Sequence, residues 1–205
     1  MTILAIETST PCGSVAVLED GVSVFNEVFT ADRSHTSSLF QSLERARKCS
    51  DRCNTIVVGL GPGSYAGIRV AISAAIGLSA GFQAELVGIP SVVAMASRRG
   101  EYFVIGDARR AEFYYAFVCN GECVEGPELL AAEQLQSRIM QRPDRLIVSS
   151  ESLEMVPQAE LAFPSALRLA RLARVGKSIA MRNDLEPIYL RDPHITRPKA
   201  TPTLR

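Results

Sequence analysis

A glycine-rich turn followed by a lone arginine is the stretch of this sequence best suited to chemistry. Residues 61–64 read Gly-Pro-Gly-Ser, and Arg69 is the one charged residue between Arg52 and Glu85. A turn of this kind between a strand and a helix presents backbone N–H groups to an anion. A cation in the first turn of a helix opposes the helix dipole, so Arg69 needs an anionic partner. We expect a carboxylate of this chain in that role, and a ligand phosphate is the alternative.

Cysteine and histidine, the usual ligands of transition metals, occur at spacings that predict no metal site. The five cysteines include two C-x-x-x-C pairs and no C-x-x-C pair. The two histidines, His35 and His194, cannot share one face of a helix. We expect free thiols in a reducing cytosol, and zinc or a redox pair is the alternative.

The glycine-rich turn needs a strand before it and a helix after it. The β-branched run at residues 55–58 predicts the strand. Ser64 is the expected N-cap of a helix over residues 66–80, and Gly81 is its expected terminator. Apolar or small residues stand on every side of this helix, which predicts burial inside its own domain or against another chain.

The residues before this strand predict a strand meander covered by a helix. Asp20-Gly21 favours a tight hairpin turn within the meander. The expected strands cover residues 2–8, 14–18 and 22–29. The helix over residues 36–48 places four apolar residues on one face, namely Leu39, Phe40, Leu43 and Ala46. A short strand over residues 85–88 and a helix beginning near Ser91 follow.

The same pattern restarts near Gly100 in abbreviated form. The expected elements are strands over residues 101–107, 112–119 and 122–125, a helix over 131–140, a strand over 145–149, a helix over 165–174 and a strand-like piece over 188–190. Such an order is typical of a mixed α/β fold. We expect one lobe at residues 1–100, a reduced second lobe at 101–190, and a basic, proline-containing tail at 191–205.

Charge and hydropathy exclude several classes of protein. The 22 basic and 22 acidic residues of this 205-residue chain cancel, which argues against a dominant phosphate-binding surface but allows a local basic patch. The first seven residues lack the basic segment of a signal peptide. The apolar run at residues 55–84 is long enough to raise the question of a membrane span. Its Gly-Pro-Gly turn and Arg69 divide it, so we predict no span and a cytoplasmic protein.

Three segments together resemble the TsaB (YeaZ) family of bacterial proteins. They are Ile6-Glu7-Thr8-Ser9, the run from Gly61 to Arg69, and the run from Asp107 to Tyr114; His35-Thr36 and the run from Pro187 to Arg191 add to the likeness. The likeness covers most of residues 1–117 well and the rest loosely. The family often has Asp at the position of Glu7 and Phe-Thr at Tyr65-Ala66. The resemblance implies an α/β fold, a duplicated actin-like ATPase (ribonuclease H-like) fold of two mixed lobes with the second abbreviated.

The resemblance also implies a role in forming N6-threonylcarbamoyladenosine in tRNAs that read codons beginning with A. This chain would be the non-catalytic partner of a TsaD-type transferase, and a TsaE-type ATPase would join them. Alone it would form a homodimer, and tRNA would be contacted only indirectly or through the complex. The metal-bearing paralogue needs paired histidines on a helix, so we expect no metal and no catalytic residue here.

The family's functional positions can be carried over residue by residue. The partner interface, on the first two helices, would include Thr36, Leu39, Phe40, Leu43, Arg47, Ile68, Ile72, Ala75 and Ile76. A nucleotide site, with ATP or ADP as ligand and no obligatory cofactor, would include Glu7, Ser9, Gly61, Gly63, Ser64, Arg69 and Asp107. We expect this cleft to be vestigial, with its carboxylates paired to Arg69 or Arg109.

Three other interpretations remain open at this stage. Both helices can simply cover the sheet without contacting a partner. The chain can be an active ATP-dependent small-molecule kinase or ATPase, with Glu7 and Asp107 holding magnesium, although no general base is evident and the second half is short for an adenosine pocket. A zinc peptidase is a third class, and its ligand set is missing.

Overall fold

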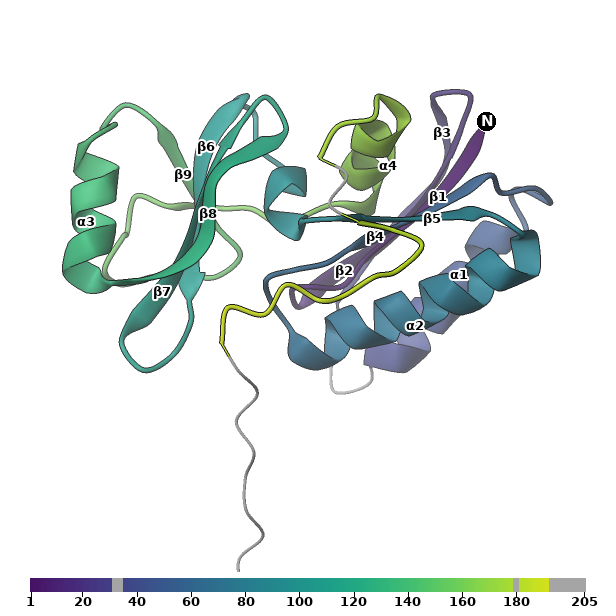
Figure 1. Ribbon diagram of the computed structural model, residues 1–205, viewed down its shortest axis with the longest axis horizontal. Coiled ribbons are helices and arrows are strands. Elements are labelled where there is room, and N and C mark those ends of the chain that lie inside the picture. Colours follow the sequence, from purple (N-terminus) through teal and green to yellow (C-terminus); the bar gives the residue numbers. More distant parts are fainter. Residues whose placement is uncertain (31–34, 179–180, 192–205) are drawn as a thin grey trace, which may run out of the picture.

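The computed structural model describes residues 1–30, 35–178 and 181–191, leaving aside the side chain of His35. Within those ranges the strands form two sheets that stand beside each other (Figure 1). The two histidine side chains and the basic tail after residue 191, for which we had specific expectations, lie outside the described residues.

The first sheet runs in the order β11-β5-β4-β1-β2-β3. Its strands are β1 (Thr2–Glu7), β2 (Cys12–Glu19), β3 (Val22–Thr30), β4 (Thr55–Gly59), β5 (Glu85–Ile89) and β11 (Met181–Arg182). β1 pairs antiparallel with β2 and parallel with β4. Every residue of β1 and β4 is buried, as their continuous apolar sequence predicts for strands covered on both faces.

Helices cover both faces of the first sheet (Figure 1). On one face, α1 (His35–Arg47) and α2 (Tyr65–Phe82) pack around a cluster that includes Leu39, Ile56 and Ile68. On the other face, α4 (Ala166–Arg174) packs around a separate cluster that includes Ile3 and Leu169. α4 follows the second sheet in the chain but belongs by its packing to the first.

The helix after the glycine-rich turn is confirmed with longer bounds than expected. Ser64 caps it, because its side-chain oxygen accepts a hydrogen bond from the N–H of Gly67 at 3.2 Å. The helix passes through Gly81, so the expected terminator is wrong, and Gln83 takes the left-handed conformation at the end instead, with φ of 54°. Its length and composition alone would allow α2 to cross a membrane. In this fold it is a layer on the sheet with 33% of its residues buried, and the absence of a span stays a prediction.

The second sheet repeats the first in the order β10-β9-β6-β7-β8. Its strands are β6 (Glu101–Asp107), β7 (Glu112–Cys119), β8 (Glu122–Ala131), β9 (Leu146–Ser149) and β10 (Glu160–Leu161), and α3 (Ala132–Met140) covers it. β6 pairs antiparallel with β7 and parallel with β9, as β1 does with β2 and β4. The duplicated fold with an abbreviated second lobe is therefore confirmed.

The abbreviation falls at one place in the second lobe. Where α2 connects β4 to β5 in the first lobe, residues 150–159 connect β9 to β10 without a helix. Buried Leu153 and Val156 from this connection fill part of the core that a helix would otherwise cover. The second lobe consequently has a counterpart of α1, which is α3, but none of α2 among the described residues.

Several expected elements differ in the structure. The helix expected near Ser91 is a single 3-10 turn, η1 (Ser91–Ala94). The strand expected over residues 122–125 continues to Ala131, and residues 188–190 form no strand. α4 and β11 both attach to the first sheet. Two elements from residues 101–190 thus pack on the sheet of residues 1–100, and the expected division into lobes at residue 100 stays a prediction.

Candidate functional site

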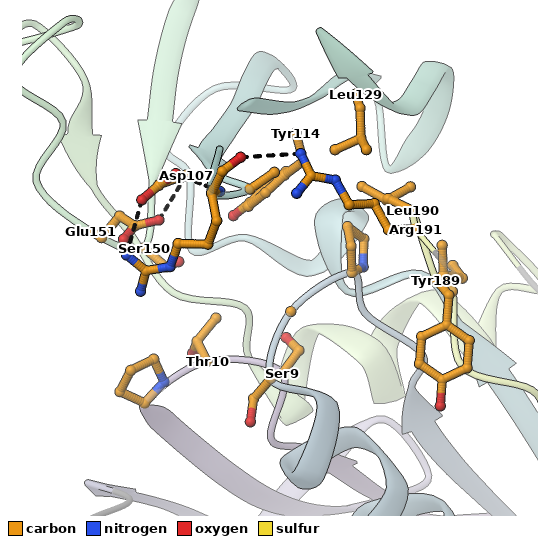
Figure 2. A pocket seen from close by; sticks show the side chains of 17 residues that line it. Ser9, Thr10, Asp107, Tyr114, Leu129, Ser150, Glu151, Tyr189, Leu190 and Arg191 are labelled. Atoms are coloured by element: carbon orange, nitrogen blue, oxygen red, sulfur yellow. Dashed lines mark hydrogen bonds and ion pairs between the residues drawn. The ribbon is translucent and has the colours of Figure 1, made fainter. Parts of the chain in front are cut away.

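A cavity of about 470 Å³ lies where the two sheets meet (Figure 2). It is surrounded by the turn after β1, the turn before α2, the end of β6 with the β6–β7 turn, one residue each of β7 and β8, the residues after β9, and the carboxyl-terminal segment. The lining residues are Ser9, Thr10, Pro11, Pro62, Gly63, Ser64, Asp107, Ala108, Arg109, Tyr114, Leu129, Ser150, Glu151, Ile188, Tyr189, Leu190 and Arg191. Hydroxyl, carboxylate and guanidinium groups thus alternate with aliphatic side chains around it.

The glycine-rich turn packs directly against the turn after β1. The N–H of Ser64 donates to the carbonyl oxygen of Ser9 at 2.7 Å, and a Cβ on Gly63 would lie 2.0 Å from that same oxygen. The N–H of Gly61 donates to Oγ of Ser91 at 3.0 Å. These glycines permit close backbone approach, and the N–H groups of Gly61 and Ser64 are occupied within the chain rather than free for an anion.

Glu7 lies beneath this packing and does not line the cavity. Its side chain is fully buried, and Oε1 accepts a hydrogen bond from the N–H of Ser9 at 2.6 Å. Glu7 Oε2 and Ser9 Oγ are buried without a hydrogen-bond partner among the described residues. A Cβ on Gly59 would lie 2.0 Å from Oε2, so only glycine leaves room for the carboxyl group. Burial raises the pKa of Glu7, against the smaller opposing effect of the hydrogen bond from Ser9.

Replacing Glu7 with glutamine is expected to stabilise the chain at neutral and alkaline pH. The pKa of Glu7 is raised in the folded state. Its contribution to the free energy of unfolding is therefore intact below the unfolded-state pKa and is lost as pH rises through the folded-state pKa. Glu7→Gln removes that loss and should give the higher Tm at pH 8, with the difference shrinking below pH 4.5. Thermal unfolding across this range measures it. An equal difference between the two proteins at every pH would show that folding does not raise the pKa of Glu7.

Asp107 occupies the position in β6 that Glu7 occupies in β1. Unlike Glu7 it faces the cavity, where it forms an ion pair with Arg109 at 3.1 Å and accepts from the N–H of that residue at 2.6 Å (Figure 2). Its own N–H donates to Glu151 at 2.8 Å. Asp107 is therefore paired with Arg109, as expected, and Glu151 adds a second carboxylate that no sequence pattern predicted.

Arg69 has an aromatic partner where we expected an anionic one. Its Nε donates to the hydroxyl of Tyr189 at 2.6 Å, and its guanidinium carbon lies 3.8 Å from the centre of the Tyr65 ring. Among the residues that the structure describes, no carboxylate pairs with it. The prediction of an internal carboxylate is wrong because two exposed tyrosine rings supply the attraction that the cation needs.

The carboxyl-terminal segment ties the two lobes together beside the cavity. The N–H of Ile188 donates to the carbonyl oxygen of Leu60 at 2.8 Å, on the first lobe. Arg191 forms an ion pair with Glu112 and donates to the carbonyl oxygen of Arg109 at 3.1 Å, on the second. Tyr189 and Arg191 are site residues that the sequence indicated only through the resemblance of the Pro187–Arg191 run.

The expected site residues divide into two groups. Of the proposed nucleotide site, the structure places four residues on the cavity, namely Ser9, Gly63, Ser64 and Asp107, and three away from it, namely Glu7, Gly61 and Arg69. Of the proposed partner interface, five residues lie in the core of the chain, namely Leu39, Leu43, Ile68, Ile72 and Ala75. The exposed members are Thr36, Phe40, Arg47 and Ile76.

Comparison with known proteins finds a family model and relatives that are named for the same tRNA modification. The TsaD family model, tRNA N6-adenosine threonylcarbamoyltransferase, matches residues 30–192. The tRNA threonylcarbamoyladenosine biosynthesis protein TsaB of Escherichia coli (strain K12) is 28% identical over 94% of this chain and 95% of its own length. The protein of the same name from Haemophilus influenzae is 29% identical, over 94% of each.

Solved structures agree on the fold. YeaZ from Pseudomonas aeruginosa superposes with a TM-score of 0.69 at 22% identity, covering 92% of this chain and 99% of that one. A second structure from that organism, described as similar to peptidase YEAZ, gives a TM-score of 0.70 at 23% identity, covering 93% and 99%. The family model spans most of the sequence, and the relatives align over nearly their full length. The chain therefore belongs to the TsaD family and, within it, to the TsaB (YeaZ) proteins.

Proposed function

We propose that this chain is a non-catalytic partner of a TsaD-type transferase in the formation of N6-threonylcarbamoyladenosine in tRNA. The names of its relatives supply the pathway. The observation that carries the role of partner is the outer side of α2, where a half-exposed isoleucine, Ile76, stands beside two glycines, Gly77 and Gly81, with open space next to them among the described residues. Such a surface is suited to close approach by a second chain.

Two of the three glycines of α2, Gly77 and Gly81, are not required for packing among the described residues. A Cβ on Gly77 or Gly81 would meet no atom within 4 Å, whereas glycine inside a helix costs about 1 kcal/mol relative to alanine. Ile76 beside them is 51% exposed, and Phe40 on neighbouring α1 is 50% exposed. Large apolar side chains beside unfilled space on adjacent helices favour a docking face over a simple cover for the sheet.

The arrangement of the carboxylates supports a non-catalytic role. A kinase or ATPase of this fold would use Glu7 to hold a metal at the cleft, yet Glu7 is sealed beneath Gly59 and the turn after β1. Asp107, on the cavity, is paired with Arg109. No group of three metal-ligating side chains comes together within the described part of the chain. A TsaE-type ATPase and a homodimer in the absence of the transferase belong to the same proposal.

The proposal is tested with the purified chain and the TsaD-type protein of the same organism. Together they should co-elute and, when supplied with threonylcarbamoyl adenylate as donor and with the TsaE-type ATPase and ATP, modify a tRNA transcript that reads codons beginning with A. The chain alone should neither modify tRNA nor hydrolyse ATP. Depletion in cells should lower the N6-threonylcarbamoyladenosine content of tRNA. Turnover of ATP by the isolated chain, or unchanged modification after depletion, would contradict the proposal.

Replacing Gly77 with alanine is expected to stabilise the isolated chain by about 0.5–1 kcal/mol, because the new methyl group meets open space. Gly67→Ala is the matched control on the same helix. Its Cβ would lie 2.3 Å from the carbonyl oxygen of Thr8, so this variant should be destabilised. Urea unfolding gives both values. Gly77→Leu should keep the fold and lose affinity for the TsaD-type partner, and unchanged affinity would remove Gly77 from the docking face.

A further inference from the structure

The outer face of α4 carries a row of basic side chains. Arg168, Arg171 and Arg174 follow one another at three-residue spacing, and Lys177 continues the series beyond the end of the helix. Arg171, Arg174 and Lys177 are exposed, and Arg168 is partly exposed. The first three extend along about 9 Å of helix at 1.5 Å per residue. We call these four residues the α4 basic row.

The α4 basic row is not neutralised by the chain. None of its members forms an ion pair within the described ranges, whereas exposed arginines elsewhere, such as Arg45 and Arg145, pair with glutamates. Arg168 and Lys177 donate instead to the carbonyl oxygens of Ser97 at 2.9 Å and Asn120 at 3.2 Å.

One carboxylate does stand near the row. Asp20, in the β2–β3 turn, is attracted to Arg174, but the amino group of Met1 holds it in an ion pair and is the main reason that the pKa of Asp20 is lowered. The row is therefore a local excess of positive charge on a chain whose net charge is zero.

The row faces away from the proposed partner surface. α4 packs on the opposite side of the first sheet from α1 and α2 (Figure 1). Its residues Leu169 and Ala170 are buried in the cluster that includes Ile3 of β1. A transferase bound to α1 and α2 would therefore leave the α4 basic row open to solvent. A second macromolecule can contact it while the complex is assembled.

We propose that the α4 basic row binds the phosphate backbone of tRNA while α1 and α2 hold the transferase. This inference rests on the proposed function, which supplies a polyanion as substrate of the complex. Cations without an ion-pair partner in the protein bind phosphates by releasing condensed counterions, and their spread along the helix allows contact with more than one phosphate. The chain then positions tRNA directly, beyond the indirect contact expected from the sequence.

The test uses the assembled complex of this chain with the TsaD-type protein and a tRNA transcript that reads codons beginning with A. In one variant, Arg171→Gln, Arg174→Gln and Lys177→Gln remove three charges. In the matched variant, Arg171→Lys and Arg174→Lys keep them, with similar side-chain length and helix propensity. tRNA affinity is measured between 50 and 200 mM salt, beside partner affinity and Tm. A purely structural role for the row would appear as a lower Tm.

The glutamine variant should bind tRNA about 10–100-fold more weakly near 100 mM salt and show a shallower salt dependence, by about two to three released ions. The lysine variant should retain most of the affinity. Unchanged tRNA affinity in a folded, partner-bound glutamine variant would overturn the inference and leave the proposed function intact. Loss of partner affinity instead would overturn it by assigning the row to a protein contact. If the wild-type chain bound no transferase, the proposed function and this inference with it would fail.

Discussion

Replacing Phe40 and Ile76 together with glutamate is expected to abolish co-elution with the TsaD-type partner while the chain stays folded. Both side chains are about half exposed, so a charge at either position remains solvated in the free chain. In the complex each carboxylate would lose its water inside an apolar contact, which costs several kcal/mol for an unpaired charge. Truncating one of the few hot-spot residues of an interface costs about 2 kcal/mol or more, so with two charges introduced into the docking face we expect affinity to fall by about 100-fold or more.

The control for this pair lies on the other lobe. Val124 and Met140 are 53% and 77% exposed, and Val124→Glu with Met140→Glu changes the charge of the chain by the same amount. This variant should bind the transferase as the wild-type chain does, in size-exclusion and titration experiments. Equal loss in both double variants would point to a general effect of charge, and retained binding by the Phe40 and Ile76 variant would place the docking face elsewhere.

Leu39→Glu, one residue away from Phe40, is expected to prevent folding rather than to disrupt a complex. Leu39 is fully buried between α1 and the sheet, in the cluster that contains Ile56 and Ile68. Loss of its packing and burial of an unpaired carboxylate together cost about 5 kcal/mol or more. Small domains have about 5–15 kcal/mol of total stability, so most or all of it would be lost.

Circular dichroism and urea unfolding of the two variants separate the effects. Phe40→Glu alone should unfold cooperatively at nearly the wild-type midpoint, and Leu39→Glu should show no cooperative transition or a strongly lowered one. A Leu39→Glu chain that folds normally but binds no transferase would show that this leucine belongs to the interface after all, with a core looser than the structure describes.

Local sequence patterns predicted the first lobe well because its elements are fixed by nearby residues. β1 follows from a continuous apolar run, and the N-cap at Ser64 follows from its place before a helix. The error at Gly81 has a local reason too. A glycine ends a helix only where the chain turns away, and open space beside Gly81 allows the helix to continue to Phe82.

The candidate site was less predictable because distant segments build it. Tyr189, which contacts Arg69, lies 120 residues further along the chain, and its hydroxyl competes with any carboxylate for the guanidinium. The burial of Glu7 depends on a missing side chain at Gly59, on another strand. Sequence spacing likewise assigned α4 to the second lobe, although its apolar side packs on the first sheet. Such outcomes depend on packing between elements, which no local pattern encodes.

The missing helix between β9 and β10 has a consequence for assembly. A duplicated chain with a complete pair of docking helices on each half would have two docking faces. It could polymerise head to tail, because contacts whose symmetry does not close into a ring form filaments. With residues 150–159 in place of the second such helix, the described part of the second lobe has no equivalent of the docking face proposed for α1 and α2. On that proposal, we expect the contact to join two chains and not to continue into a filament.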